Sequence, residues 1–298
     1  MAPAEPRWPL LLLRRPLLGE LVVTAALGVY AACISQLGAP RPMPFYERDP
    51  TLSYDYVRPA TVPTTMLALL SVLIPGGCML AYVASCALVH AAPRALAVRS
   101  AAWHCLAVAQ ALLLTMAITD TIKVATGFPR PNFYSYCDYA GRRSNASAYL
   151  AATNPNVLGD VRRCLAPEAD VHESQLSFPS GHASISFAGM TLTALFARHA
   201  LGVRPGAHFS PSALLAASPL ILAAWIALTR VRDRYHHPVD VVCGAVLGAL
   251  GGRAAWRHLV ASGRATLLPA LWAHPHAEGA GAGDAGADGG HVHVMLEQ

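Results

Sequence analysis

Long apolar stretches alternate with short polar connections along most of the chain, and this pattern predicts membrane-spanning helices. Most stretches hold roughly 20 residues, enough for a helix to cross the roughly 30 Å of hydrocarbon in a bilayer. Pro75 lies inside the second stretch, where contacts with neighbouring helices can accommodate a kink. The six predicted spans are residues 17–36, 64–90, 101–122, 182–198, 212–229 and 239–256. The pattern therefore predicts an all-α, polytopic membrane protein with six transmembrane helices, whose even number places both termini on one side.

The composition agrees with a membrane protein and argues against a soluble one. Of the 298 residues, 54% are hydrophobic and 13% are charged, whereas about 25% of the residues in a soluble domain are charged. The 22 basic residues exceed the 17 acidic ones by a net charge of +5, and they are spread over many short segments. A nucleic-acid-binding surface needs a concentrated basic patch. We therefore expect a lipid bilayer and no nucleic acid as a partner, and the oligomeric state stays open.

Arginine residues gather at one end of the predicted spans and indicate their orientation, because positively charged loops stay on the cytoplasmic side of a membrane. These arginines are Arg7, Arg14, Arg15, Arg94, Arg99, Arg198, Arg204, Arg253, Arg257 and Arg264. The connections at the other end, including the long segment 124–178, carry nearly balanced basic and acidic residues. We therefore expect cytoplasmic termini and a long loop on the lumenal or extracellular side. The endoplasmic reticulum, the vacuole and the plasma membrane are all left open.

The same pattern divides the chain into four parts. Residues 1–16 form a cytoplasmic N-terminus, and residues 17–100 hold the first two spans with their loops. Residues 101–262 contain the remaining spans and the long loop. Residues 263–298 are rich in glycine, alanine and histidine and hold too few apolar side chains to pack, so we expect a disordered cytoplasmic tail there.

The long loop carries two signals typical of a non-cytoplasmic segment. Cys137 and Cys164 are its only cysteines, and an oxidising compartment would allow them to form a disulfide. Asn145 begins the sequence Asn-Ala-Ser, the acceptor pattern for N-linked glycosylation. Because such short signals also arise by chance, the disulfide and the glycan stand as hypotheses that agree with the orientation.

Three groups of polar residues stand where predicted spans meet the non-cytoplasmic side. In the first group, Lys123 ends the third span and Arg130 follows it after a short linker that contains glycine and proline. Two cations held this close can converge on one anion. The alternative is that both side chains simply extend to the membrane surface, as long basic side chains commonly do.

The second group, Ser180, Gly181 and His182, opens the fourth span. A helix N-terminus offers free backbone N–H groups and the positive end of the helix dipole, which together suit a phosphate group. Ser180 also fits the alternative role of a helix N-cap. Capping does not account for His182, whose imidazole lies at the predicted membrane edge.

The third group contains Arg230, His236 and Asp240, between the fifth and sixth spans. Pro238 is typical of a helix start, so His236 lies just before the helix and Asp240 lies in its first turn. A carboxylate at this spacing can hold one imidazole nitrogen and leave the other as a base or nucleophile. Arginines and histidines also occur among lipid headgroups without any chemistry. Ionisable residues in three groups along one membrane edge nevertheless favour a functional site.

Together these residues resemble the signature of the type 2 phosphatidic acid phosphatase (PAP2) superfamily, the lipid phosphate phosphatases related to vanadium haloperoxidases. Its pattern is lysine, six residues and Arg-Pro; then Pro-Ser-Gly-His; then Ser-Arg, five residues, histidine, three residues and aspartate. The chain follows these spacings from Lys123 to Asp240, with Thr229 in place of the usual serine. Phe128 stands where many members carry another arginine. The resemblance implies a PAP2/haloperoxidase-like helical core within residues 101–262.

The resemblance also implies a role for each motif residue. His236 would attack phosphorus to form a phosphohistidine, Asp240 would orient its ring, and His182 would protonate the leaving oxygen and later activate water. The phosphate-binding residues would be Lys123, Arg130, Ser180, Gly181 and Arg230. No metal ion or other cofactor is implied. Because one histidine must begin neutral and the other protonated, we expect a bell-shaped pH profile.

The activity that the resemblance implies is Mg-independent removal of phosphate from a membrane lipid. Phosphatidic acid is the expected substrate, giving diacylglycerol, and lysophosphatidic acid, diacylglycerol pyrophosphate and sphingoid-base phosphates are further candidates. A polyprenyl diphosphate phosphatase and a non-enzymatic membrane scaffold or lipid receptor are the alternatives. The intact His182, His236 and Asp240 argue against the non-enzymatic alternative.

Overall fold

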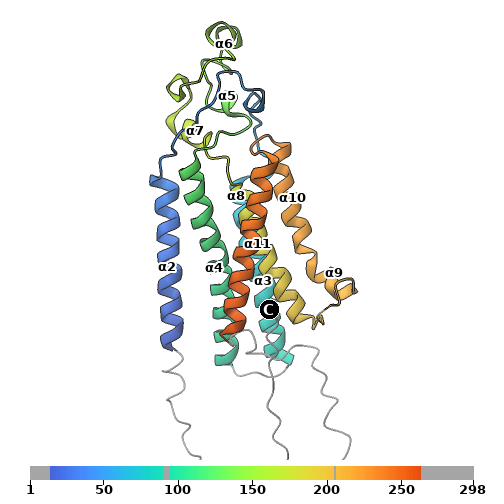
Figure 1. Ribbon diagram of the computed structural model, residues 1–298. Helices are drawn as coiled ribbons and strands as arrows, with labels where there is room; N and C mark the ends of the chain where they lie inside the picture. Colours follow the sequence, from blue (N-terminus) through green and yellow to red (C-terminus); the bar gives the residue numbers. More distant parts are fainter. Residues whose placement is uncertain (1–13, 90–93, 205, 263–298) are drawn as a thin grey trace, which may run out of the picture.

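The computed structural model describes residues 14–89, 94–204 and 206–262 as a bundle of long helices with a cap of loops at one end (Figure 1). The helices of the bundle are α2 (Arg14–Leu37), α3 (Thr64–Val89), α4 (Arg94–Thr126), α8 (Gly181–Ala200), α9 (Pro211–Ala217), α10 (Pro219–Arg232) and α11 (Pro238–Ala261). The cap holds α5 (Phe133–Tyr136), α6 (Ala146–Ala152), α7 (Glu168–Glu173) and the 3₁₀ helices Pro50–Leu52 and Val161–Arg163. The described residues contain no β-strand, which confirms the all-α class. The predicted tail, 263–298, lies outside the described residues.

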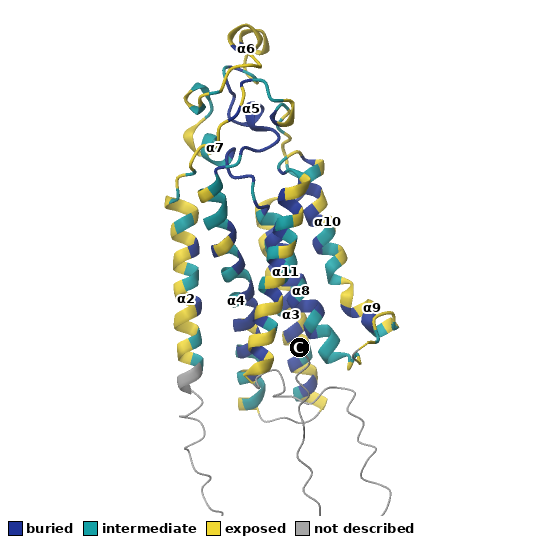
Figure 2. Cartoon of the chain, viewed as in Figure 1, coloured by how far each residue is buried: buried dark blue, intermediate teal, exposed yellow. Residues whose placement is uncertain are grey.

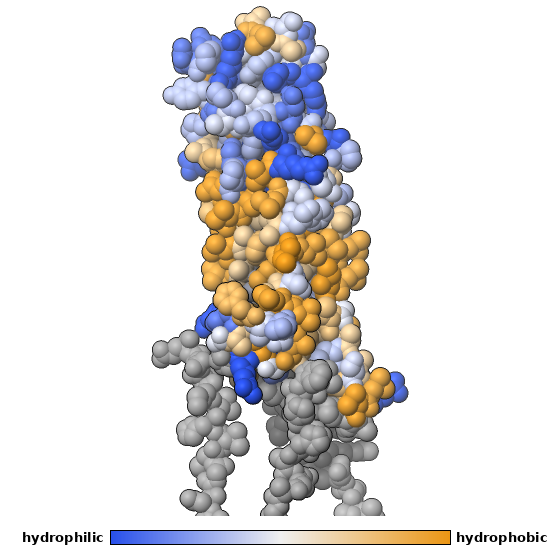
Figure 3. Space-filling view, turned by 90° about the vertical axis from the view of Figure 1, so that its right-hand side faces the viewer, coloured by the Kyte–Doolittle hydropathy of each residue, from blue (hydrophilic) through white to orange (hydrophobic). Residues whose placement is uncertain are grey.

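Five helical segments are long and apolar enough to cross a membrane. They are Leu17–Leu37, Thr64–Val89, Arg94–Thr126, Pro211–Arg232 and Pro238–Ala261. An apolar belt covers the middle of the bundle below the hydrophilic cap (Figure 3), and the outward faces of the helices are largely exposed (Figure 2). An exposed apolar surface of this extent is typical of contact with lipid. The prediction of a multi-pass membrane protein is therefore confirmed.

Helix α8 differs from the five apolar segments, although its residues correspond to the fourth predicted span. Helices α3, α4, α10 and α11 all pack against it. Its buried Ser186 and Thr193 donate hydrogen bonds to carbonyl groups one turn earlier in the same helix. Polar residues are common where helices contact one another inside a membrane protein. Of the six predicted transmembrane helices, five are thus found as apolar helical segments, and the fourth corresponds to the more polar helix α8 among them.

The boundaries of two other predicted spans also differ. The third span continues beyond its apolar stretch as the 33-residue helix α4. The fifth is divided, because α9 ends at Ala217 and α10 begins at Pro219, where proline supplies no backbone N–H to continue the helix. The start of α2 and the end of α11 lie at the end of the bundle opposite the cap (Figure 1).

Close packing of α8 against α11 sets the arrangement at the cap end of the bundle. Three glycines recur at every fourth position of α11, namely Gly244, Gly248 and Gly252. A Cβ atom on Gly248 would lie 2.1 Å from the carbonyl oxygen of Ser184, closer than real contacts allow. Small residues at this spacing let two helix backbones approach closely in a membrane. The Ser180 N–H thereby donates a 3.0 Å hydrogen bond to the Asp240 carbonyl, which ties the first turns of α8 and α11 together.

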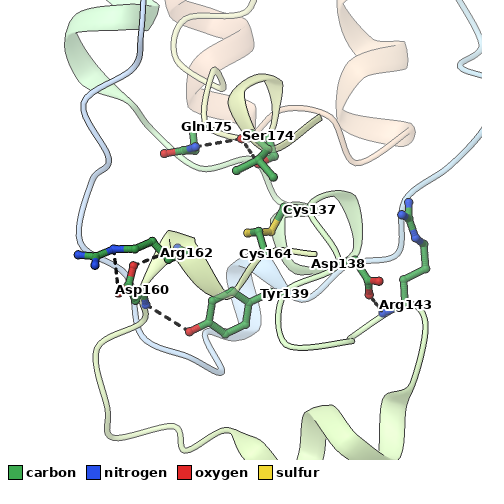
Figure 4. Close-up of a disulfide and its surroundings, with 10 residues drawn as sticks. Cys137, Asp138, Tyr139, Arg143, Asp160, Arg162, Cys164, Ser174 and Gln175 are labelled. Atoms are coloured by element: carbon green, nitrogen blue, oxygen red, sulfur yellow. Dashed lines mark hydrogen bonds and ion pairs between the residues drawn. A yellow bond between two sulfur atoms is a disulfide. The ribbon is translucent and has the colours of Figure 1, made fainter. Parts of the chain in front are cut away.

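The cap combines the connection 38–63 with the long loop that follows α4. Their buried side chains form one cluster, made of Phe45, Leu52, Phe133, Tyr134, Cys137, Tyr139 and Tyr149. Cys137 of this cluster forms a disulfide with Cys164, which packs against it, with Cα atoms 5.2 Å apart (Figure 4). The buried carboxylate of Glu47 accepts a hydrogen bond from the Tyr139 hydroxyl and pairs with Arg163. The two connections therefore pack together as a single cap at one end of the bundle.

Candidate active site

The three predicted groups of polar residues meet at one cavity of about 570 Å³ beneath the cap. Six of the eight predicted site residues line it: Lys123, Arg130, Gly181, His182, Arg230 and His236. Two carboxylates, Asp120 and Glu173, line the same cavity. The two remaining predicted residues, Ser180 and Asp240, are fully buried outside its lining. The structure thus brings most of the predicted residues together and places two of them where they support the others.

His236 presents one ring nitrogen as a candidate nucleophile. It lies in the turn between α10 and α11, only 3% exposed. Its Nδ1 atom is 2.7 Å from the carbonyl oxygen of Ser177, and since a carbonyl oxygen only accepts hydrogen bonds, the ring proton of neutral His236 belongs on Nδ1. Burial lowers the pKa of His236 to about 3, although Asp240 acts to raise it and Arg130 adds to the lowering. His236 is therefore neutral near pH 7, with its lone pair on Nε2.

Asp240 lies behind His236 and acts on it less directly than the spacing suggests. Its Oδ2 atom accepts hydrogen bonds from the Ser177 hydroxyl at 2.6 Å and the His237 backbone N–H at 2.9 Å. The Nδ1 atom of His236 is 3.8 Å from the same oxygen, beyond hydrogen-bond distance. Ser177 therefore holds His236 through its carbonyl and Asp240 through its hydroxyl, a role that sequence reasoning did not assign to it.

His182 lies at the start of α8 and contacts the backbone of the connection between α2 and α3. Its Nε2 atom is 3.1 Å from the carbonyl oxygen of Val62, so neutral His182 carries its proton on Nε2 and leaves Nδ1 to exchange a proton. Ser180 is the N-cap of this helix, and its Oγ accepts from the N–H of Ala183. The Ser180 side chain therefore caps the helix, as the alternative interpretation expected. Gly181 and His182, at the N-terminus of α8, line the cavity.

Arg230 is buried, and its guanidinium forms hydrogen bonds with two neighbouring side chains. Only 2% of it is exposed, and its guanidinium donates to the Thr229 hydroxyl at 3.1 Å and to the Asp233 carboxylate at 3.1 Å. Thr229 thus supplies the hydroxyl that a serine provides at this motif position. The pairing fixes the direction of the guanidinium, which also lines the cavity.

Lys123 and Arg130 flank a tight turn at the end of α4. Gly127 has a φ of +54°, and a Cβ atom there would lie 1.7 Å from the Arg41 carbonyl oxygen, so only glycine fits. After the turn, Arg130 donates to the Glu173 carbonyl at 2.9 Å and pairs with the Glu173 carboxylate. The Nζ atom of Lys123 would lie 3.4 Å from a Cβ atom built on Gly181, which places this cation at the N-terminus of α8.

Glu173 is a cavity residue that could not be selected from the sequence, because no motif surrounds it. Burial acts to raise the pKa of Glu173, but the charges of Arg130 and Lys123 outweigh it and hold the pKa below its ordinary value. The charged carboxylate therefore occupies part of the positive surface that an incoming phosphate would use. Within the described residues, no three His, Cys, Asp or Glu side chains gather as a metal site would require.

Phe128 is one of the two departures from the PAP2 pattern that the sequence resembles, at a position where many members carry an arginine. Its ring meets the His237 ring edge to face, with centroids 5.5 Å apart, and His237 in turn contacts Asp240 at 3.3 Å. An aromatic side chain here packs against the residues that support the candidate nucleophile. The usual arginine of this position is thereby replaced by an apolar contact.

The cavity thus gathers three cations and two histidines at the end of an apolar helix bundle. The sequence profile of the PAP2 superfamily matches residues 104–264, more than half of the chain. The chain therefore belongs to the PAP2 superfamily. All eight predicted site residues lie inside the matched region.

Several curated relatives carry related names. The chain is 38% identical over 147 residues to "Lipid phosphate phosphatase 1" of Arabidopsis thaliana, covering 49% of this chain and 42% of the relative. It is 34% identical over 152 residues to "Phospholipid phosphatase 2" of Bos taurus, covering 49% and 47%. It is 33% identical over 140 residues to "Probable diacylglycerol pyrophosphate phosphatase 1" of Schizosaccharomyces pombe, covering 46% and 47%. The matches span less than half the length of each relative, and no solved structure matches the chain.

Proposed function

We propose that this protein is a lipid phosphate phosphatase that removes the phosphoryl group of phosphatidic acid or a similar membrane lipid through a phosphohistidine. The observation that carries the proposal is the free Nε2 of His236 at a cavity lined by Lys123, Arg130 and Arg230. A neutral imidazole beside three cations suits attack on an anionic phosphate ester, because the cations stabilise the charge that the five-coordinate transition state carries.

The proposed reaction has two steps. In the first, Nε2 of His236 bonds to phosphorus while the bond from phosphorus to the lipid oxygen breaks, and His182, which begins protonated on both ring nitrogens, gives the Nδ1 proton to that oxygen. In the second, His182 takes a proton from a water molecule that attacks phosphorus, which releases inorganic phosphate and restores His236. The three cations and the backbone N–H groups at the start of α8 bind the phosphoryl oxygens throughout. No metal ion or other cofactor enters either step.

The walls of the cavity favour a lipid over a soluble phosphate ester. Apolar side chains from four helices and from the connection before α3 line the same cavity as the cations: Ile34, Val62, Leu67, Met116 and Ile185. These residues belong to or adjoin the bundle, at the level where a lipid anchored in the bilayer would present its headgroup. Burial of the first part of an acyl chain there would add affinity in proportion to the apolar area covered.

A lipid diphosphate is the second candidate substrate. Lys123, Arg130 and Arg230 line the cavity together with the α8 N-terminus, and one relative is named "Probable diacylglycerol pyrophosphate phosphatase 1". The same two-step chemistry would release the terminal phosphate and leave a lipid monophosphate.

Phosphate release from phosphatidic acid in mixed micelles, with excess EDTA, tests the proposal. We expect steady release by the purified protein, and a panel with lysophosphatidic acid, diacylglycerol pyrophosphate and a sphingoid-base phosphate would then rank the substrates. Folded protein that releases no phosphate from any of these lipids would contradict the proposal and favour a non-enzymatic lipid receptor.

The pH dependence of kcat/KM provides a further prediction. Burial lowers the pKa of His236 from its ordinary 6.5 to about 3, so protonation removes the nucleophile only in more acidic solution than for an exposed histidine. We therefore expect the acid limb of the bell-shaped profile to have its midpoint below pH 6.5. Rates across about pH 2 to 9 would locate its midpoint. An acid limb centred at or above the ordinary histidine pKa would contradict the neutral state assigned to His236.

We propose that the cap and cavity face the lumen or the exterior and that the termini are cytoplasmic. Asn145 supports this orientation, because it lies exposed at the start of α6 in the cap, where an oligosaccharide could be attached. We expect a glycosidase that removes N-linked glycans to increase the electrophoretic mobility of the protein made in eukaryotic cells, and Asn145→Gln to abolish this shift. Modification of engineered cytoplasmic-end sites instead would reverse the proposed orientation.

A further inference from the structure

The connection between α2 and α3 contacts the cavity residues although it lies outside the matched family region. Its last part, residues 56–62, is here called the α2–α3 segment. It touches the surroundings of Arg130, Arg230 and His182 through Tyr56, Thr61 and Val62. We propose that this segment completes the active site as a set of positioning residues, which orient the two arginines and select the tautomer of His182.

The contact with Arg230 passes through Asp233. The Thr61 backbone N–H and hydroxyl donate to the two carboxylate oxygens of Asp233 at 2.7 and 2.8 Å. Asp233 is 4% exposed and also accepts from the Arg230 guanidinium at 3.1 Å. A carboxylate held by two donors keeps a fixed orientation, and the arginine bound to it is fixed as well. Thr61 thereby sets the direction in which Arg230 faces the cavity.

The contact with Arg130 is an aromatic wall made of Tyr56, Tyr136 and Tyr235, which all line the cavity. Tyr56 stacks on Tyr136 with ring centroids 4.1 Å apart and meets the edge of Tyr235 at 5.7 Å. The Arg130 guanidinium lies 5.5 Å from the centroid of Tyr235 and 6.0 Å from that of Tyr136. Aromatic faces attract a guanidinium at these distances. Tyr56 therefore packs against both of the rings that contact Arg130 and helps to hold them in position.

The contact with His182 is made by the backbone. The Val62 carbonyl accepts from Nε2 of His182 at 3.1 Å, and this bond leaves Nδ1 as the nitrogen that exchanges the proton. Because Thr61 precedes Val62, its two bonds to Asp233 also hold this carbonyl in place. One short segment thus positions both a proposed phosphate-binding arginine and the proposed acid–base histidine.

Thr61→Val tests the proposal, because it removes the hydroxyl and keeps the size of the side chain. Binding of inorganic phosphate by calorimetry is the first readout and KM for phosphatidic acid the second. We expect both Kd and KM to rise about fivefold, the scale of one ordinary hydrogen bond, because the Thr61 backbone N–H still holds Asp233. The change in kcat should be smaller. Thr61→Ser, which keeps the hydroxyl, should restore both values.

Thr51→Val is the matched control, since Thr51 also donates its hydroxyl to an aspartate, Asp49, in the same connection but away from the cavity. Equal losses in Thr51→Val and Thr61→Val, an unchanged Thr61→Val, or no rescue by Thr61→Ser would each overturn the proposal. The expected change in KM rests on the proposed function, because it requires hydrolysis of phosphatidic acid. The expected change in the Kd for inorganic phosphate does not. Failure to hydrolyse any lipid would remove that function and leave the calorimetric comparison to decide.

Tyr56 gives an independent check of the aromatic wall. Tyr56→Phe keeps the stacked ring and should leave phosphate binding near the wild-type value, whereas Tyr56→Ala should raise the Kd several-fold because Arg130 loses its support. Tyr54→Ala is the control, because Tyr54 belongs to the same connection and is not among the cavity residues. Equal Kd values for Tyr56→Ala and the wild type would remove Tyr56 from the proposed set.

Discussion

Replacement of His236 by alanine is expected to reduce phosphate release from phosphatidic acid by about four orders of magnitude or more, as loss of an enzymatic nucleophile does. The reason is that Nε2 of His236 is the only atom to which the proposed mechanism transfers the phosphoryl group. The remaining cations and the α8 N-terminus bind phosphate but offer no acceptor for it. The loss should therefore appear in kcat, while the binding of inorganic phosphate persists.

His208→Ala is a suitable control, because His208 lies between α8 and α9, exposed and outside the cavity lining. It should hydrolyse phosphatidic acid at the wild-type rate. If folded His236→Ala keeps more than about a hundredth of the wild-type kcat, the phosphoryl group is transferred elsewhere, and the covalent mechanism with His236 is wrong.

Replacement of Arg230 by lysine is expected to lower kcat/KM by about two to three orders of magnitude, the typical effect of removing one positioned donor to a transition-state oxygen. Lysine keeps the positive charge but cannot donate to Thr229, Asp233 and the substrate with one planar group. Its ammonium group would pair with Asp233 alone. The Asp233 carboxylate would then lose the orientation that it has between Thr61 and the Arg230 guanidinium.

Arg232→Lys is the matched control, since Arg232 is two residues later on α10 and exposed to solvent. It should leave kcat/KM within about twofold of the wild type, as surface substitutions usually do. Similar activity in Arg230→Lys and Arg232→Lys would show that only the charge of Arg230 matters, and would contradict the fixed orientation assigned to its guanidinium.

The apolar pattern was sufficient to predict the helical class and most of the helices, because a helix that contacts lipid must be apolar along its length. It was not sufficient for α8. The hydroxyl residues Ser186 and Thr193 of α8 donate hydrogen bonds to backbone carbonyls of the same helix, which is packed among its neighbours. Hydropathy counts these residues without regard to what surrounds them, so it cannot distinguish a central helix from a lipid-facing one.

The motif spacing was sufficient to select the residues that meet at the cavity, since each motif sits at the start or end of a helix. The partners of these residues could not be found in this way. The Ser177 and Val62 carbonyls that fix the two histidine tautomers belong to the backbone, which every residue type carries. Glu173 and Tyr56 reach the cavity through the packing of the cap, and its loops have no periodicity from which their path follows.

Trapping of the covalent intermediate tests the central claim most directly. Purified protein would be mixed with phosphatidic acid that carries radioactive phosphate, stopped in alkali during turnover and digested. We expect the label on the peptide that contains His236, stable in alkali and lost in acid as a phosphorus–nitrogen bond is, and absent from His236→Ala. Steady turnover with no labelled protein, or with the label on another residue, would contradict the account.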